Sequence, residues 1–457
     1  MQIQSAEQID IIKVTLFSER FREGTILHVA GIETDAPTAL EINVYETLTL
    51  PYLTGSLVLQ DDNDVYRLAR LSGTERLKVV LKNPSDNASG FIEKTFMLTS
   101  IKKSAKSTDT ATLLFIQLIE NHAYFSQLRP FNKSYTGTGP TIIEKILKDN
   151  LNVGLYPDYW KDPYGHDFRY IVPWQDPFTA CKSIVNSLTT DNGLPYFLTA
   201  TLTKEERILT DLESILTREA FNKGNPFIYS TGATPLAGGQ QILSPEDKAL
   251  IIADYRATDL EETLSMAQRG AIGASYSHVN VNSGEPYEQR INMEEEFKNL
   301  EAREILPRGM RIPVDTKFRE QPDGPMNIAL PDYDSRRFFT FSENPFIDTQ
   351  TMYNDLVNVR LSIVKNNFIK YLLRNVHEIY VPGLLFSTAN IVTAVGHQVE
   401  IQLLQSNPGE AESVSSDDEK RSGTYVMLAK RHIFNLVDSR HNVAMSVGRL
   451  AERAVQA

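Results

Sequence analysis

Cysteine is almost absent from this chain of 457 residues, which holds only Cys181. A single cysteine can form no disulfide within the chain and cannot build a cysteine-based zinc site. Runs of about 18 apolar residues, the length that a membrane-spanning helix needs, are also missing. The N-terminal segment 1–5 lacks the basic and apolar regions of a secretion signal. We therefore expect a chain that folds in a cytoplasm and has no membrane span.

Basic residues are outnumbered. Lysine and arginine total 46 against 58 aspartates and glutamates, and the net charge is -12. Such a balance opposes general affinity for nucleic acid, because binding to DNA is driven largely by contacts with phosphate. It is compatible with DNA that passes an acidic surface without adhering to it.

Recognisable catalytic motifs are missing too. The sequence has no phosphate-binding loop of the G-x-x-x-x-G-K-S/T type, no G-x-S-x-G elbow and no H-E-x-x-H pair. The glycine pair in Gly270-Ala271-Ile272-Gly273 lacks a third glycine and a preceding strand, so it predicts a turn. We predict no catalytic, cofactor-binding or metal-binding residues, no cofactor, and no enzymatic activity.

A few polar clusters could imitate a site. His166-Asp167 lies near Asp158 and Asp162, but the spacing defines no set of metal ligands, and an exposed loop is the better interpretation. Glu294-Glu295-Glu296 is interpreted as a solvated helix face, since consecutive helical residues point in different directions.

Two histidines and one cysteine of the predicted elements need their own interpretation. We expect His432 and His441, in or near the last hairpin, to be exposed to solvent. Cys181 on the apolar side of a helix is expected to be a small buried hydrophobe.

The stretch 156–174 is rich in aromatic residues. It could be a sugar-binding platform, and it could equally be a core or a subunit contact, because aromatic side chains dominate both. Packing is the favoured interpretation. The residues concerned are Tyr156, Tyr159, Trp160, Tyr164, Phe168, Tyr170 and Trp174.

The first 120 residues predict antiparallel β structure, because short segments with strand periodicity are separated by turn residues. This spacing is typical of a small barrel or sandwich. The expected strands are Leu40 to Glu46, Gly55 to Asp61, Arg76 to Lys82, Phe91 to Lys103 and Thr110 to Glu120.

The chain then changes character. Gly139-Pro140 and Asp176-Pro177 each predict the start of a helix, since proline suits the first helical turn. Leu194 to Leu202 predicts a strand, and the glycines of 206–247 predict an extended loop.

Later segments alternate between strands and helices. We expect strands at Leu250 to Tyr255, Ala274 to Asn282, Gly383 to Phe386, Val399 to Leu404 and Tyr425 to Val437, and a long helix at Thr351 to Leu372. The acidic, serine-rich segment 406–423 predicts a disordered hairpin tip.

Several of these segments, in their order along the chain, resemble the central baseplate hub protein of T-even-like contractile phages. Relatives of that family include the hub region of type VI secretion spike proteins. The resemblance is carried by Tyr52 to Asp61, Gly139 to Ile143, Ile171 to Phe178, the helix near 351–372 that leads into Pro382-Gly383, and the hairpin Tyr425 to Ser446.

The resemblance implies an α+β, β-rich fold with two tube-like antiparallel β-barrel modules, an α/β insert and a peripheral helical insertion. The implied domains are a first barrel at 1–120, an α/β domain at 121–205, an extended connection at 206–247, a second, discontinuous barrel at 248–292 and 380–446, the insertion with the long helix at 293–379, and a tail at 447–457.

It also implies a function. Three copies with two modules each would give a ring of six that joins a sixfold tail tube to a trimeric central spike and leaves a channel for DNA. The implied partners are the spike, tail tube or tube-initiator proteins, the tape measure protein and baseplate wedge proteins, with DNA as a transient passenger. The protein would reside in the virion baseplate after assembly in the host cytoplasm. A cell-wall polysaccharide hydrolase or a glycan-binding tail protein are the alternatives.

Overall fold

The architecture comes from a computed structural model of the whole chain. It describes residues 5–7, 10–29, 38–61, 68–82, 91–106, 112–157, 159–164, 168–230, 244–259, 263–280, 286–298, 300, 311–313, 327–342, 355–386, 391–405, 416–418 and 421–450. None of the helices in this part of the chain is long and apolar enough to cross a membrane.

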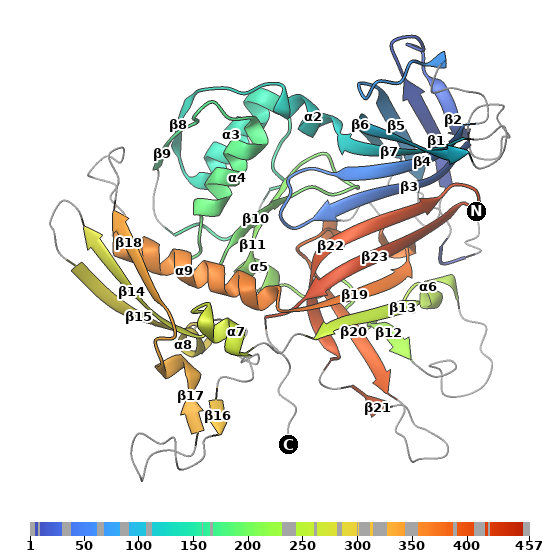
Figure 1. The fold of residues 1–457 in the computed structure, drawn as a ribbon. Helices are drawn as coiled ribbons and strands as arrows, with labels where there is room; N and C mark the ends of the chain where they lie inside the picture. The colour runs from blue at the N-terminus through green and yellow to red at the C-terminus, as the bar shows by residue number, and fades with distance from the viewer. Residues whose placement is uncertain are drawn as a thin grey trace.

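The N-terminal third forms one set of antiparallel strands, drawn in blue in Figure 1. Residues alternate between buried and less buried along β4 and β5, as expected where one sheet face covers a core. That core holds Leu57, Leu77, Phe96 and Ile116. The strands are β1 (Asp10–Phe17), β2 (Thr25–Val29), β3 (Thr38–Thr47), β4 (Thr54–Asp61), β5 (Arg76–Lys82), β6 (Ile92–Lys106) and β7 (Thr112–Glu120).

A second set of strands comes mainly from the C-terminal part and surrounds its own core, which includes Phe227, Val381 and Met445. It is continuous with the first set through a pairing of β22 with β3 (Figure 1). The strands are β12 (Phe227–Ser230), β13 (Asp254–Asp259), β19 (Asn375–Pro382), β20 (Gln398–Gln405), β21 (Ser416–Asp417), β22 (Gly423–Asn435) and β23 (Arg440–Gly448).

The resulting sheet has the order β13-β19-β23-β22-β3-β4-β7-β6-β5-β1-β2, with β20, β12 and β21 branching from β22. Within the described residues this path does not close on itself. The β-rich class expected from the sequence is therefore observed as one large, mainly antiparallel sheet.

An α/β region packs beside the first set of strands. Its helices begin as the sequence predicts: Thr138 and Asp176 cap α3 and α4, and a proline occupies the first turn of each. Cys181 is fully buried in its core, as expected. The elements are α2 (Asn121–Gln127), β8 (Ser134–Gly137), α3 (Gly139–Leu151), β9 (Phe168–Ile171), α4 (Pro177–Ser187), β10 (Tyr196–Thr199), β11 (Ile208–Asp211) and α5 (Leu212–Thr217).

Most of the remaining elements form a peripheral layer around α9, at the left and below the centre of Figure 1, whereas the short α6 lies at the right, near β13. Phe368 and Tyr371 of α9 pack edge-on against Phe297. The elements are α6 (Pro245–Lys248), α7 (Thr263–Gln268), β14 (Gly273–Asn280), β15 (Pro286–Asn292), α8 (Met293–Lys298), β16 (Arg311–Pro313), β17 (Asn327–Ala329), β18 (Arg337–Ser342) and α9 (Asp355–Leu372).

Three sequence expectations need correction. Residues 384–386 form a short 3-10 helix, and the strand that precedes it, β19, lies at Asn375–Pro382. The stretch 206–247, expected to be an extended loop, contributes β11, α5 and β12. The strand expected at Leu250 to Tyr255 is shifted to Asp254–Asp259, because Ile251 and Ile252 pair with β12 instead.

Other expectations fall partly outside the description. The long helix is observed from Asp355, and residues 351–354 before it are outside the described part of the chain. Most of the acidic segment 406–423 is outside it as well. Of the glycine pair at 270–273, Gly270 lies, as predicted, in the turn after α7, and Gly273 is the first residue of β14.

Candidate functional site: the seam between the two sets of strands

The most distinctive arrangement in the molecule is the place where the two sets of strands join, which we call the seam. It consists of the antiparallel pairing of β3 from Glu41 to Thr47 with β22 from Ala429 to Asn435. The preceding residues of β22, Gly423 to Val426, pair with β20 instead. One strand therefore changes partner along its length.

The two halves of β22 also belong to different cores. Tyr425 and Met427 lie in the core of the second set, whereas Phe434 lies in the core of the first set. Because a strand cannot leave one core without disturbing the other, the seam makes the two sets a single structural unit.

A fully buried ionic cluster crosses the seam. The Glu46 carboxylate on β3 lies 3.0 Å from the Lys430 ammonium and 3.2 Å from Nε2 of His432, both on β22. It also accepts a hydrogen bond of 2.8 Å from the backbone N–H of Leu202. The ammonium of Lys430 donates to the carbonyl of Thr393 at 2.6 Å.

Electrostatics favours an ionised Glu46. Burial alone would raise the pKa of its carboxyl, but the charge of Lys430 and the hydrogen bond to His432 outweigh it and hold the pKa well below the usual value. Burial lowers the pKa values of His432 and of His441, which lie 3.0 Å apart between ring nitrogens. Both imidazoles are therefore neutral near pH 7.

The buried positions of His432 and His441 correct the expectation that they are exposed. Strand alternation alone places a residue on one face or the other, and it does not reveal that His432 shares the inward face of Phe434. A signal is present in the sequence: Glu46 shares a strand face with Ile42 and Val44, and Lys430 and His432 share one with Phe434. Charges on an apolar strand face predict a buried pair, since buried charges are usually paired.

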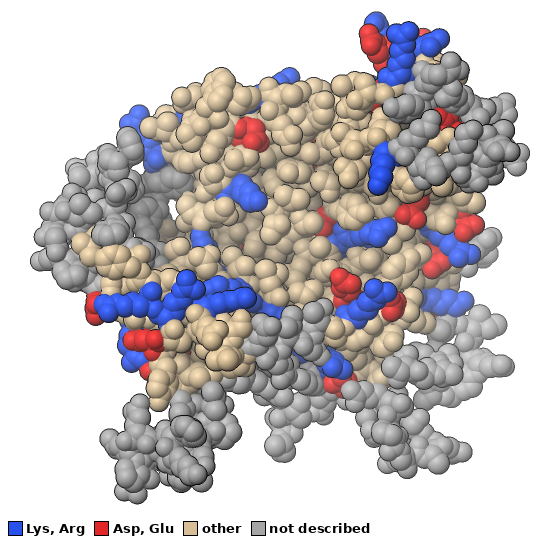
Figure 2. Space-filling view, in the orientation of Figure 1, with Lys and Arg blue, Asp and Glu red and all other residues tan. Residues whose placement is uncertain are grey.

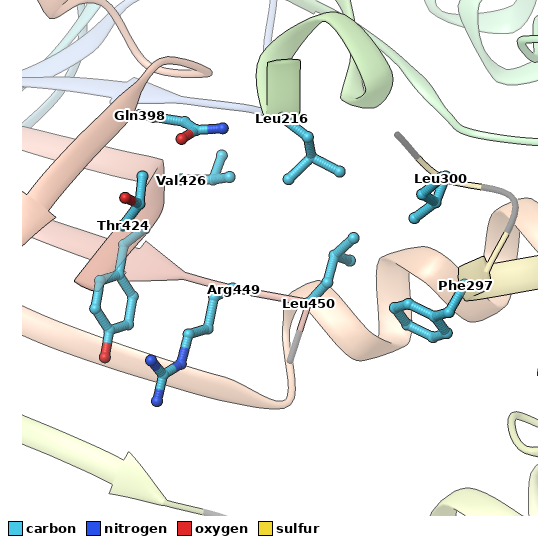
Figure 3. Close-up of a pocket in the computed structure, with 9 residues that line it drawn as sticks. Leu216, Phe297, Leu300, Gln398, Thr424, Val426, Arg449 and Leu450 are labelled. Carbon is cyan, nitrogen blue, oxygen red and sulfur yellow. The ribbon is translucent and has the colours of Figure 1, made fainter. Parts of the chain in front are cut away.

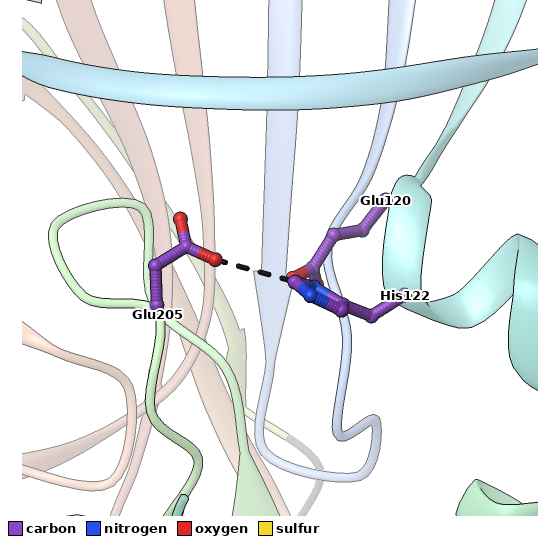
Figure 4. Close-up of side chains that lie close together, drawn as sticks. All are labelled: Glu120, His122 and Glu205. Atoms are coloured by element: carbon purple, nitrogen blue, oxygen red, sulfur yellow. Dashed lines mark hydrogen bonds and ion pairs between the residues drawn. The ribbon is translucent and has the colours of Figure 1, made fainter. Parts of the chain in front are cut away.

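A second ionic cluster lies at the end of β7, where Glu120 is buried, His122 is half-buried and Glu205 is exposed, and it contains the group most similar to a metal site. Glu120, His122 and Glu205 bring three ligand atoms within 4.8 Å of one another, as Figure 4 shows. However, Glu120 is bound by Arg207 at 2.7 Å, and Glu205 is bound by Lys94 at 2.8 Å.

These internal cations already neutralise the two carboxylates. Burial alone would raise the pKa of Glu120, but Arg207 and the neighbouring hydrogen bonds lower it to about 2. The cluster therefore acts as a structural ion network that ties β7 to the segment before β11.

The other polar candidates from the sequence do not converge. Glu296 is buried against Arg360, which corrects the expectation of a fully solvated acidic face, while Glu295 is exposed. Asp162 is exposed, and Asp158, His166 and Asp167 lie outside the described residues.

The aromatic stretch mostly packs. Trp160 and Tyr170 contact the core of the α/β region, and Tyr159 lies edge-on to Tyr156 while its hydroxyl is 2.6 Å from His397. Trp174 differs, because it is 68% exposed. Packing, the favoured interpretation, therefore holds for Tyr156, Tyr159, Trp160 and Tyr170 and not for Trp174.

Two cavities were considered as binding sites. The cavity in Figure 3, of about 160 Å³, is lined by apolar side chains such as Leu216 and Leu450, and its Gln398 amide already donates to the Ile215 carbonyl at 2.7 Å. A larger one, of about 460 Å³, lies between α4, β10 and α9. Neither is lined by a carboxylate, and in the larger one Lys365, one turn from Ser362, donates its ammonium to the Asn186 carbonyl.

Charge is distributed unevenly despite the acidic balance. Lysine and arginine gather in a band on the face shown in Figure 2, in the region where Figure 1 draws α9 and the three-stranded sheet of β15, β14 and β18. Burial, together with the nearby charges of Arg336 and Arg269, lowers the pKa of Lys370. The described part of the chain thus has local positive regions outside the seam.

The two sets of strands have the same connectivity. The first set has the spatial order β3-β4-β7-β6-β5-β1, and the second has β13-β19-β23-β22-β20-β12. When strands are numbered by their order along the chain, ignoring β2 and β21, the two orders are identical. The first four pairings are antiparallel in both sets, and the last is antiparallel in the first set and parallel in the second.

No protein-family model and no curated protein matches the sequence. Among solved structures, the chain is similar to a tail protein from Neisseria meningitidis, with 9% identity, 96% of each chain covered and a TM-score of 0.46. It is also similar to a 43 kDa tail protein of prophage MuSo2 from Shewanella oneidensis, with 9% identity, 96% of this chain and 98% of that chain covered, and a TM-score of 0.49.

A third similar structure is an Escherichia coli component of the type VI secretion system. It has 8% identity and a TM-score of 0.41, and the match covers 94% of this chain and 79% of that one. Likenesses at this level do not establish a shared function.

Proposed function

We propose that this chain is a structural tail protein, a baseplate hub that forms a trimeric ring of six β modules. The ring would join the tail tube to a central spike and leave a channel for DNA. One observation carries the proposal: the chain contains the same strand connectivity twice, and the two copies lie side by side in one sheet. A chain with two equivalent modules lets a threefold assembly present six similar units.

The seam supports a mechanical role. Its ionic cluster is buried on all sides, and the two cores share β22, so the two modules cannot move independently. A rigid connection of this kind suits a ring that transmits load between a tube and a spike.

The chemistry of the described residues supports a non-enzymatic role. The most buried carboxylates are all committed internally: Glu46 and Glu120 pair with cations, and Asp211 accepts hydrogen bonds from Ser214 and from the backbone N–H of Lys161. Catalytic carboxylates need instead a free oxygen that faces a substrate cavity.

Further parts of the proposal follow the resemblance seen in the sequence. The domains would be 1–120, 121–205, 206–247, 248–292 with 380–446, 293–379 and 447–457. The range 248–292 is modified by one feature, since its strands β14 and β15 lie outside the large sheet, in a three-stranded sheet where β14 pairs with both β15 and β18. The partners would be a trimeric spike, tail tube or tube-initiator proteins, the tape measure protein and wedge proteins.

Native mass spectrometry of the purified full-length chain tests the proposal. We expect three times the chain mass of 51.5 kDa, and electron micrographs of the same particles should show a ring with an open centre. A chain that stays monomeric at all concentrations, both alone and with a trimeric spike protein, would contradict it.

A further inference from the structure

In the first set of strands, the strand edge equivalent to the one that β3 covers at the seam has no partner strand among the described residues. We call the first and second sets of strands the first and second modules. In the second module, β22 pairs with β20 up to Val426 and with β3 from Ala429 onward. In the first module the equivalent strand, β6, pairs with β5 from Ile92 to Met97. From Ser100 to Lys106, β6 pairs only with β7 among the described residues.

The irregularities of the two strands fall at the same place. The pairing of β6 with β7 shifts register between Leu98 and Ser100, and the pairing of β22 with β23 shifts between Met427 and Ala429. A bulge of this kind bends a strand and ends its pairing on one side. Ser100 in the first module therefore corresponds to Ala429 in the second, where the seam begins.

The strand that would fill the open edge is also present. In the first module, β3 is the terminal strand, and its free edge forms the seam by pairing with β22 of the second module. Its equivalent, β13, is the last strand of the large sheet and pairs only with β19 in the described part of the chain. Asp254, Arg256 and Ala257 of β13 are exposed. Figure 1 shows β13 and β6 far apart in the sheet, on opposite sides of the seam.

We propose that β13 of one copy pairs antiparallel with Ser100–Lys106 of β6 in the next copy, and so repeats the seam between chains. This inference rests on the proposed ring and names its subunit interface. Each copy contributes β13 to one neighbour and the edge of β6 to the other, so the two surfaces of the contact differ and the contact is of the head-to-tail kind. Such contacts form a closed ring when the rotation between copies is a whole fraction of a turn. It would also remove two unpaired sheet edges.

The internal repeat fixes the register of this contact. Val44 of β3 is opposite Gly55, which is opposite Leu118, and Ala257 of β13 is opposite His377, which is opposite Val447. Leu118 and Val447 face the two equivalent bulges.

Ala257 therefore takes the place of Val44. Val44 is opposite His432, three residues after Ala429, so Ala257 should be opposite Lys103, three residues after Ser100.

The sequence of the two strands is complementary in charge at this register. The open part of β6 carries Lys102, Lys103 and Lys106, and β13 carries Asp254 and Asp259 together with one cation, Arg256, which pairs with Asp254 of its own strand at 3.3 Å. Opposite charges at facing or diagonal positions stabilise a strand pair, and like charges there destabilise it. An accidental association of two β6 edges would bring lysines together and is disfavoured.

Cysteine cross-linking of the full chain tests the pairing. The variant Lys103→Cys/Ala257→Cys places two thiols at facing positions, where Cα atoms of a strand pair lie about 4.5 to 5.5 Å apart, within reach of a disulfide. Under mild oxidation we expect covalent dimers and trimers on a non-reducing gel. The native Cys181 is buried and should not react.

The matched control is Lys102→Cys/Ala257→Cys. A shift of one residue places the thiol on the other face of the sheet, so we expect at least ten-fold less cross-linked product. Each single-cysteine variant should give none.

Native mass spectrometry of the same samples separates the two proposals. Trimers that cross-link through Lys103→Cys and not through Lys102→Cys support the interface. Trimers that do not cross-link, or that cross-link equally in both variants, overturn the interface and leave the ring. Variants and parent that are all monomeric overturn both.

Discussion

At the scale of single residues, the most consequential feature is the ion cluster of Glu46 with Lys430 and His432. Its members are fully buried, so their charges are compensated by one another and not by water. A change that removes one charge and leaves the other unpaired should therefore lower the stability of the seam.

We predict that Glu46→Gln lowers the free energy of unfolding by about 3–5 kcal/mol, because Lys430 then remains as an unpaired buried charge. The double variant Glu46→Gln/Lys430→Met should recover more than half of that loss. Urea denaturation followed by circular dichroism at one protein concentration measures both values.

The control for this prediction is Glu41→Gln, at the end of the same pairing. Glu41 and Arg431 are partly exposed and 3.6 Å apart, so the loss should be about 1 kcal/mol or less. An equal loss in Glu41→Gln and Glu46→Gln would show that burial of the cluster does not determine its effect.

At the scale of elements, the start of α4 illustrates how local sequence determines structure. Asp176 precedes the helix with an extended backbone, and its carboxylate accepts hydrogen bonds from the Thr179 N–H at 3.1 Å and from the Ser126 hydroxyl at 2.9 Å. The same residue therefore caps α4 and links it to α2.

We predict that Asp176→Ala destabilises the chain by about 1–2 kcal/mol, the usual effect of losing an N-cap. The exposed pair of Asp149 with Lys133 provides the comparison, and Asp149→Ala should cost about 0.5 kcal/mol. Urea midpoints of the two variants, with an unchanged denaturant slope, give the measurement. Equal midpoints would mean that the cap contributes nothing beyond a surface charge.

Elements also show where prediction from sequence fails. The sequence predicts a strand at Gly383 to Phe386, because this segment is as apolar as a short strand, but the strand is β19 and residues 384–386 form a 3-10 helix. Burial does alternate along β19, but Asn375 and His377 occupy buried positions while Val376 and Tyr380 occupy less buried ones. The apolar residues therefore do not alternate, and periodicity alone does not detect the strand.

At the scale of the whole molecule, buried titratable groups on separate elements all make the folded chain less stable as the pH falls. Burial, with the nearby charge of Arg218, lowers the pKa of His397 from 6.5 to about 4, and burial also lowers the pKa values of His432 and His441. The pKa of Glu120 is about 2 in the folded chain. The unfolded chain therefore binds more protons than the folded one at acidic pH.

We predict that the free energy of unfolding falls as the pH is lowered from 6.5 toward 4, where the histidines become protonated in the unfolded chain only. Each such group contributes a slope of up to about 1.4 kcal/mol per pH unit. The carboxylates add to the loss below pH 4.5. Urea unfolding at pH 7.5, 6.5 and 5.5 measures the slope.

The variant His397→Gln should reduce the slope by up to about 1.4 kcal/mol per pH unit, because one proton-binding group is removed from the unfolded chain. Its amide can still accept from Tyr159, so the fold should be retained. Stability that is unchanged or greater at pH 5.5 than at pH 7.5 would contradict the prediction.

The sequence by itself determined the β-rich class, the starts of α3 and α4, the turn at 270–273 and the buried Cys181. These depend on contacts between residues close in the chain, or on composition. Only the tertiary structure decided that two strand sets share one connectivity, that β22 joins them, and that His432 and His441 are buried. Such features depend on pairings between residues as distant as Glu46 and Lys430, which one strand's periodicity does not encode.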